Sequence, residues 1–244
     1  MNAHKKRTYY TGFTLAEMAV ALVILSLLVI GATTGKHLVH QSNVAKVSVE
    51  LIRYKDLSRQ FKDRYLALPG DFSNAESFWS DPGVDNGDGD GRINVNDNED
   101  MQFWKHLTAA DLLEADYTGD DEQYVIGVNI PKGPLNGTGY YIRFIAVVDH
   151  NGDIHQANWL SYFTALPGAI LPIGPSLTQE EAFNVDSKID DGRPFGGYLW
   201  SRTGAADSTG TPVTTPCSTG GIYDVSSNTR SCRLKFAIDE IYLY

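Results

Sequence analysis

The sequence predicts an α+β protein: a long N-terminal α-helix packed on a head made of an antiparallel β-sheet with helical insertions. Two observations predict this fold class. First, the apolar run from Phe13 to Ala32 continues into a stretch with apolar residues at every third or fourth position as far as Tyr65. Second, the rest of the 244-residue chain alternates runs rich in Val, Ile, Tyr and Phe with turns rich in Gly, Pro and Asn, which is typical of antiparallel strands.

The first part of the predicted helix is long enough to cross a membrane. At 1.5 Å per residue, the run Phe13 to Ala32 measures about 30 Å, one hydrocarbon thickness. Lys5, Lys6 and Arg7 precede the run and favour a cytoplasmic N-terminus. Glu17 is the only charged residue in the run. Because a carboxylate in hydrocarbon is costly, Glu17 indicates a function.

The residues leave three interpretations of this segment open. It could be a signal peptide cut after the small residues at positions 31–32, although the run is longer than the usual 7–15 residues or so of such peptides. It could also be a plain signal anchor. Neither interpretation accounts for Glu17. The third interpretation is cleavage before the apolar run, with Glu17 retained for assembly.

The segment TGFTLAEM resembles the leader junction of type IV pilins and pseudopilins, in which a short basic leader ends in Gly, followed by Phe and, at the fifth mature position, Glu. The matching residues are Gly12, Phe13 and Glu17. The resemblance implies cleavage between Gly12 and Phe13 by a prepilin peptidase, methylation of the new amine, and the pilin fold. Ala16 and Met18 stand where this family often has Ile or Leu.

Removal of residues 1–12 would free the α-amino group of Phe13. We expect Phe13 and Glu17 to lie on one helix face, since they are four residues apart. A carboxylate buried in lipid needs a cation, and the ammonium of a neighbouring copy would supply one and set the register of an assembly. The resemblance thus implies other pilin-like subunits as partners through this helix. It also implies the bacterial inner membrane, a periplasmic head and a pilus or pseudopilus as the locations.

The second part of the predicted helix is amphipathic, and its apolar stripe is expected to pack against the head. The stripe consists of Val44, Val47, Leu51, Tyr54, Leu57, Phe61 and Tyr65. The segment ALPGD at 67–71 ends the helix with Pro and Gly. We therefore predict a leader at 1–12, a transmembrane half at 13–32, an amphipathic half at 33–66 and a head at 67–244.

Within the head, the sequence predicts two further helices and three strands. The helices are 101–117 and 177–192, and the second opens with a capping box formed by Thr178 and Glu181. The strands are 123–130, 139–148 and 232–244. The segment PLNGTG suits a hairpin connection between the first two strands, and DHNGD is a turn after the second. The Ser/Thr/Gly-rich stretch 203–228 is expected to be a surface loop.

An acidic loop at 85–100, DNGDGDGRINVNDNED, predicts a calcium site. Aligned with the EF-hand template, it supplies Asn86, Asp88, Asp90 and Asp97 as side-chain ligands and the carbonyl of Arg92. Asn at the first position and Asp at the last depart from the template; the Asp resembles dockerin loops. Asp85, Glu99 and Asp100 are further candidates. The other interpretation is a solvated turn, but the mutual repulsion of so many carboxylates favours a bound cation. Pseudopilins of type II secretion systems include calcium-dependent members.

A second acidic cluster, Asp186, Asp190 and Asp191, lies at the end of the predicted helix 177–192. Acidic groups there oppose the helix dipole, which makes a cation or a specific hydrogen bond plausible without requiring either. Its role stays open from the sequence.

The two cysteines, Cys217 and Cys232, predict one disulfide in an exported protein. Closing this loop would contribute about 3 kcal/mol to stability.

Composition and motifs exclude other function classes. The net charge of −10 argues against nucleic acid as a partner. We find no catalytic motif and expect a protein without enzymatic activity. The alternative to an assembly subunit is a membrane-anchored periplasmic binding module, for example a carbohydrate reader. Its sugar platform would be sought among Trp79, Trp104, Trp159 and Trp200.

Overall fold

The computed structural model describes residues 12–119, 123–166, 174–206 and 211–243. The fold is α+β, as the sequence predicts, with the long helix α1 (Leu15–Tyr65) followed by an antiparallel sheet and shorter helices. Contacts divide the chain into two units, Met1–Ser42 and Asn43–Tyr244. The remaining elements are α2 (Ala75–Phe78), α3 (Glu99–Ala109), β1 (Thr138–Val148), β2 (Ile154–Thr164), β3 (Leu177–Thr178), α4 (Gln179–Ile189), β4 (Leu199–Thr203), β5 (Ser218–Thr219), β6 (Ile222–Tyr223), β7 (Arg230–Ala237) and β8 (Tyr242–Leu243).

Helix α1 changes character along its length. Its apolar side chains before residue 43 are exposed, whereas the stripe predicted for its second half is buried. Val44, Val47, Leu51, Tyr54, Leu57 and Phe61 are the buried members, and Tyr65 packs partly buried beside them. The helix ends at Tyr65, and Leu66 follows in a left-handed conformation with φ 60°, a common way to terminate a helix.

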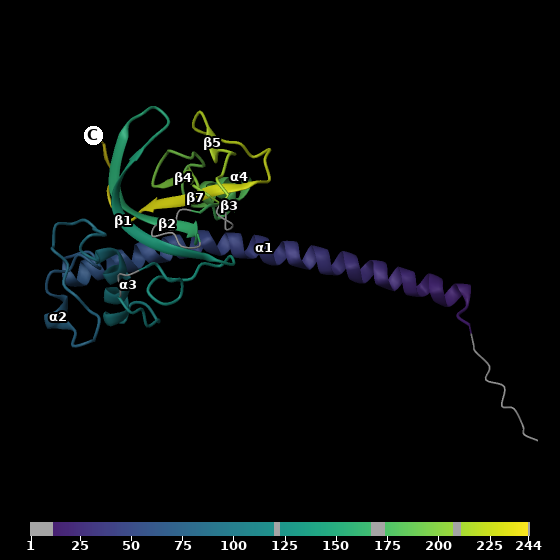
Figure 1. Cartoon of the computed structure of the whole chain (residues 1–244), viewed down its shortest axis with the longest axis horizontal. Coiled ribbons are helices and arrows are strands. Elements are labelled where there is room, and N and C mark those ends of the chain that lie inside the picture. The colour runs from purple at the N-terminus through teal and green to yellow at the C-terminus, as the bar shows by residue number, and fades with distance from the viewer. Residues whose placement is uncertain (1–11, 120–122, 167–173, 207–210, 244) are drawn as a thin grey trace, which may run out of the picture. The chain divides into compact units, whose positions relative to one another are not determined.

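The sheet is antiparallel throughout and has the order β1-β2-β7-β3, with β4 also paired to β7 and β8 to β2 (Figure 1). A long hairpin joins β1 and β2, whose register runs from Thr138 opposite Thr164 to Val148 opposite Ile154. The predicted turn DHNGD connects these strands. Strand β7, the last long segment of the chain, therefore lies in the middle of the sheet.

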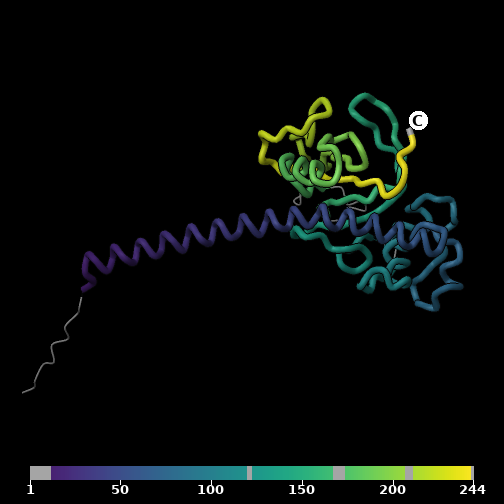
Figure 2. Tube along the Cα trace, turned by 180° about the vertical axis from the view of Figure 1, so that it is seen from behind, coloured from purple at the N-terminus to yellow at the C-terminus, as the bar shows by residue number. Residues whose placement is uncertain are grey.

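The main core lies between the sheet and the second half of α1, and it continues to α3 on the other side of the helix. The ring of Tyr54 in α1 contacts Trp104 of α3 with centroids 5.0 Å apart and Tyr140 of β1 with centroids 5.1 Å apart. Figures 1 and 2 show the sheet on one side of this part of α1 and the segment with α2 and α3 on the other. A smaller cluster around Trp159 and Trp200 covers the outer face of the sheet.

Three local predictions for the head are confirmed. Strand 139–148 is β1, and helix 177–192 is α4. Thr178 caps α4, since its hydroxyl accepts the Glu181 N–H at 3.2 Å while the Glu181 carboxylate accepts the Thr178 N–H at 2.9 Å. The helix predicted at 101–117 exists as α3, but it begins at Glu99 and ends at Ala109.

The strand predicted at 123–130 is wrong. Gly127 has a φ of 82°, and the Val128 N–H donates to the carbonyl of Val125, so the segment folds into a turn. The side chain of Asn129 accepts the Val125 N–H at 2.7 Å and completes this turn. The chain nevertheless reverses at PLNGTG: the Gly133 N–H donates to the carbonyl of Thr138, and Lys132 forms an isolated antiparallel bridge with Gly139. The predicted hairpin connection is therefore present, although a single bridge and not a strand precedes it.

The prediction for the C-terminal part of the head needs three corrections. The strand predicted at 232–244 is two strands, β7 and β8, because the Asn158 N–H of β2 donates to the side chain of Asp239 at 3.2 Å and not to the backbone of the segment after Ala237. The stretch 203–228, described except for 207–210, contains β5 and β6. Strands β2 and β4 had not been predicted. Strand β2 pairs along its whole length with β1 through the turn DHNGD, whereas β4 pairs with β7, a distant partner that a local pattern does not reveal.

Candidate functional site

The N-terminal motif lies at the start of α1. Gly12 and Phe13 precede the helix, and the side chain of Phe13 is 83% exposed. Because α1 begins at Leu15, Phe13 does not share a helix face with Glu17 in the uncut chain. The basic leader residues Lys5, Lys6 and Arg7 lie outside the described residues.

Glu17 forms a capping box with Thr14 that the sequence analysis had missed. The Glu17 carboxylate accepts both the backbone N–H and the hydroxyl of Thr14 at 2.8 Å, and the Glu17 N–H donates to the Thr14 hydroxyl at 3.2 Å. The signal was present in the sequence as the pattern Thr-x-x-Glu at a helix start. Glu17 thus stabilises the start of α1, in addition to any role in assembly.

Helix α1 is the one helix in the described part of the chain that is long and apolar enough to cross a membrane. Its side chains around Leu22, Leu25 and Leu28 are exposed on all sides. A helix that is apolar all round needs a surrounding apolar medium or partner.

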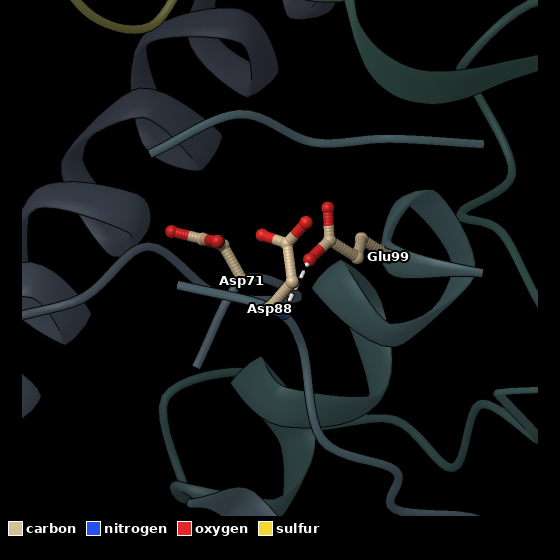
Figure 3. Close-up of side chains that lie close together, drawn as sticks. All are labelled: Asp71, Asp88 and Glu99. Carbon is tan, nitrogen blue, oxygen red and sulfur yellow. Dashed lines mark hydrogen bonds between the residues drawn. The ribbon is translucent and has the colours of Figure 1, made fainter. Parts of the chain in front are cut away.

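A second candidate site is an acidic centre in the head, formed by Asp71, Asp88 and Glu99. One carboxylate oxygen from each lies within 4.8 Å of the others (Figure 3). Asp71 belongs to the turn that follows α1, Asp88 to the acidic loop, and Glu99 is the first residue of α3. Asp71 had not been predicted, because it stands far from the loop in the sequence and only the folded turn brings it there.

Backbone N–H groups of the acidic loop donate hydrogen bonds to all three of these carboxylates. Glu99 accepts the N–H of Asp88 at 2.9 Å and that of Asn94 at 2.8 Å. Asp71 accepts the Gly91 N–H at 3.0 Å through Oδ2. Asp88 accepts the Asp90 N–H at 2.9 Å. The conformation of the backbone from 88 to 94 therefore depends on where these three carboxylates lie.

Two members of the centre are buried: Asp71 is 3% exposed and Glu99 is not exposed at all. Burial, with a smaller contribution from the neighbouring carboxylates, raises the pKa of Asp71 to about 6 and that of Glu99 to about 7. Backbone N–H donors only partly offset these effects. No ion pair to these three carboxylates forms within the described ranges.

The other predicted calcium ligands lie outside this centre. Asn86 exchanges hydrogen bonds with Glu76, and Asp90 accepts the Arg92 N–H at 2.8 Å. Asp97 is exposed. Of the carboxylates in the EF-hand alignment, Asp88 alone belongs to the acidic centre in the described part of the chain.

The additional candidates Asp85 and Asp100 also have other partners. Asp85 accepts a hydrogen bond from the side chain of Gln102 at 3.2 Å. Asp100 accepts the hydroxyl of Tyr124 and the N–H of Met101. Of the additional candidates, Glu99 alone belongs to the acidic centre.

The second acidic cluster, Asp186, Asp190 and Asp191, also converges, but its oxygens are used by the chain itself. Asp186 accepts the Tyr223 hydroxyl at 2.6 Å and the Gly192 N–H at 3.0 Å. Asp190 accepts two N–H groups at the start of β4, and Asp191 accepts the Arg193 N–H. These bonds give the cluster a structural role at the end of α4.

The predicted disulfide is present. Cys217 and Cys232 are bonded and both fully buried, and they tie the segment before β5 to strand β7.

Comparison with family models matches residues 7–33 to the prokaryotic N-terminal methylation motif. The matched segment contains the cleavage residues Gly12 and Phe13, the capping pair Thr14 and Glu17, and the apolar first half of α1. Comparisons with curated proteins and with solved structures found no match. The motif supports the type IV pilin family for the N-terminus and is consistent with membrane anchoring.

Proposed function

We propose that this protein is a pilin-like structural subunit, a pseudopilin or a minor pilin. A prepilin peptidase would cut it between Gly12 and Phe13 and methylate the new amine. The subunit would then assemble through α1 with other pilin-like subunits, into a type IV pilus or the pseudopilus of a type II secretion system. Its head would be stabilised by calcium.

The observation that carries this proposal is that the methylation motif covers the start of an exposed apolar helix. Cleavage there would leave an amine within a few residues of Glu17. The amine of Phe13 and the carboxylate of Glu17 would then lie at the same depth in the apolar medium around α1, where an unpaired carboxylate is costly. A neighbouring subunit offers the compensating charge.

The rival function, a membrane-anchored carbohydrate-binding module, receives less support from the head. Trp104, Trp159 and Trp200 are buried, and Trp79 packs partly buried against the core. Sugar platforms need exposed aromatic faces, and none of these four tryptophans presents a freely exposed one.

The first test is the intact mass and N-terminal residue of the protein purified from its own membranes. We expect a chain that begins with N-methylated Phe13. A chain that begins at Met1 would indicate a plain anchor, and one that begins near Thr33 a discarded signal peptide. Either result would contradict the proposal and favour the binding module.

The second test separates assembly from helix capping at Glu17. Glu17→Gln removes the charge, yet Gln also forms capping boxes, so α1 should still begin normally. We expect this variant to be cleaved and folded but to enter filaments at a small fraction of the wild-type level, measured by shearing and quantitative immunoblotting. Thr14→Ala is the matched control: it breaks the capping box and keeps the charge. If Thr14→Ala fails to assemble while Glu17→Gln assembles normally, capping is the role of Glu17 and charge pairing is excluded.

A further inference from the structure

We propose that Asp71, Asp88 and Glu99 form a calcium site that joins the end of α1 to the start of α3. This inference concerns the calcium part of the proposed function and is independent of filament assembly. It replaces the EF-hand alignment of the acidic loop with a ligand set drawn from three separate segments.

An unpartnered oxygen points to a missing ligand. Asp71 is almost completely buried, and its Oδ1 has no hydrogen-bond partner in the described chain. Buried polar atoms are nearly always paired, so each exception calls for a specific explanation. The same carboxylate belongs to the group whose oxygens lie within 4.8 Å of one another. A cation between these carboxylates would remove the repulsion among the three charges, and binding through both oxygens of Asp71 would also satisfy Oδ1.

The spacing of the oxygens fits calcium. Calcium binds oxygens at about 2.3–2.6 Å, so two ligands on opposite sides of one ion are about 4.6–5.2 Å apart. The separations in the centre fall within this limit. The hydrogen bonds to the loop leave lone pairs free, because each carboxylate oxygen accepts more than one bond. In the view of Figure 3, the carboxylate of Asp88 lies between those of Asp71 and Glu99.

The site is also open to ions and water on one side. A cavity of about 780 Å³ is lined by Asp71, Gly89 and Gly91, among other residues. Because calcium takes six to eight oxygens, water entering from this cavity can complete the shell that three carboxylates begin. Arg59 and Lys62 line the same cavity, but neither forms an ion pair with Asp71.

Occupation of the site would couple three parts of the head. Asp71 follows the turn that ends α1, Asp88 lies in the acidic loop, and Glu99 is the first residue of α3. The backbone bonds from the loop to Asp71 and Glu99 already depend on these carboxylates. Calcium would hold the carboxylates together and thereby stabilise the acidic loop.

The test measures calcium binding to the full processed chain in detergent, by isothermal titration and by the shift of the melting temperature between CaCl₂ and EDTA. Asp71→Asn and Asp88→Asn remove charge from the centre. We expect both to raise the Kd for calcium by about tenfold or more, since affinity follows the charge of the ligands. Asp97→Asn is the matched control. It removes the same charge from an exposed position of the loop outside the centre and should bind calcium nearly as the wild type does. Asp90→Asn, whose charge acts on Asp71, is included to test the EF-hand alignment.

Asp71→Asn has a second readout that a structural defect would not produce. In EDTA its melting temperature should equal or exceed that of the wild type, because the substitution relieves repulsion in the empty centre. If Asp71→Asn does not fold, the exposed Asp88→Asn carries the test.

Two results would overturn the proposal. Loss of binding in Asp90→Asn and Asp97→Asn, with normal binding in Asp71→Asn and Asp88→Asn, would restore the EF-hand alignment. No calcium binding to the wild type would remove both the site and the calcium part of the proposed function. Neither result would contradict the proposal that the protein assembles into filaments.

Discussion

His106 shows how a single buried residue holds two loops of the head together. The Gly70 N–H donates to Nδ1 of His106 at 2.8 Å, and Nε2 lies 2.8 Å from the carbonyl of Asp85. Nδ1 must therefore accept and Nε2 must carry the proton, so the imidazole is neutral. Burial lowers its pKa to about 4. The sequence presented only a lone histidine near acidic residues; the structure makes it a link between the helix-ending turn and the acidic loop.

This pKa predicts a loss of stability in acid that depends on His106. The unfolded chain protonates His106 below about pH 6.5, whereas the folded chain resists protonation down to about pH 4. The contribution of the neutral His106 ring to the unfolding free energy is therefore fully present above about pH 6.5, and it is lost as the pH falls towards 4. Between about pH 7 and pH 4.5, the wild type should lose about 2–3 kcal/mol of unfolding free energy relative to His106→Gln.

The measurement is urea unfolding of both proteins at the two pH values. Comparison with the variant cancels the opposite effect of the buried carboxylates, whose raised pKa values favour the folded state in acid. Parallel pH dependence in the two proteins would show that folding does not lower the pKa of His106.

At the scale of the element, α1 illustrates how one helix can meet two environments. Its first half is apolar on every face, and its second half is apolar on one face only. The alternation of buried and exposed positions around Leu51 and Ile52 follows the period of 3.6 residues. Packing against the head therefore depends on the stripe and not on total hydrophobicity.

We predict that Leu51→Ala lowers the unfolding free energy of the head by about 2–5 kcal/mol, because it leaves a cavity in the core. Leu51 is fully buried, whereas the neighbouring Ile52 is 43% exposed. Ile52→Ala, which removes a side chain of similar size from the same helix, should cost much less. Chemical denaturation monitored by tryptophan fluorescence compares the two. Equal losses would mean that the stripe does not face the core.

At the scale of the whole molecule, the contacts divide the chain between Ser42 and Asn43, within α1 and ten residues after the apolar run. The described core residues all belong to the unit from Asn43 onward. That unit also contains the whole sheet, the disulfide and the acidic centre.

We predict that a chain of residues 43–244 folds on its own and remains soluble without detergent, because it keeps every described core contact and loses the exposed apolar helix. A cooperative melting transition and an oxidised Cys217–Cys232 pair would confirm this. The chain from Phe13 should require detergent. Aggregation of the shorter chain would show that the first half of α1 contributes to the fold of the head.

Features encoded in local patterns could be predicted from the sequence alone. These are the methylation motif at 7–33, the long helix with its buried stripe, strand β1, and the capping box of α4. Each depends on residues within a few turns of one another, or on a periodicity that burial imposes along one element. The disulfide was also predictable, because only two cysteines exist.

Contacts between distant parts of the chain depend on the fold and could not be predicted in this way. The segment 123–130 has strand-forming residues, but Gly127 and the side chain of Asn129 close it into a turn. The EF-hand spacing placed the calcium ligands within one loop, whereas the fold brings Asp71 from the end of α1 to Asp88 and Glu99. No local pattern encodes that approach, because it depends on how α1, the loop and α3 pack around a shared core.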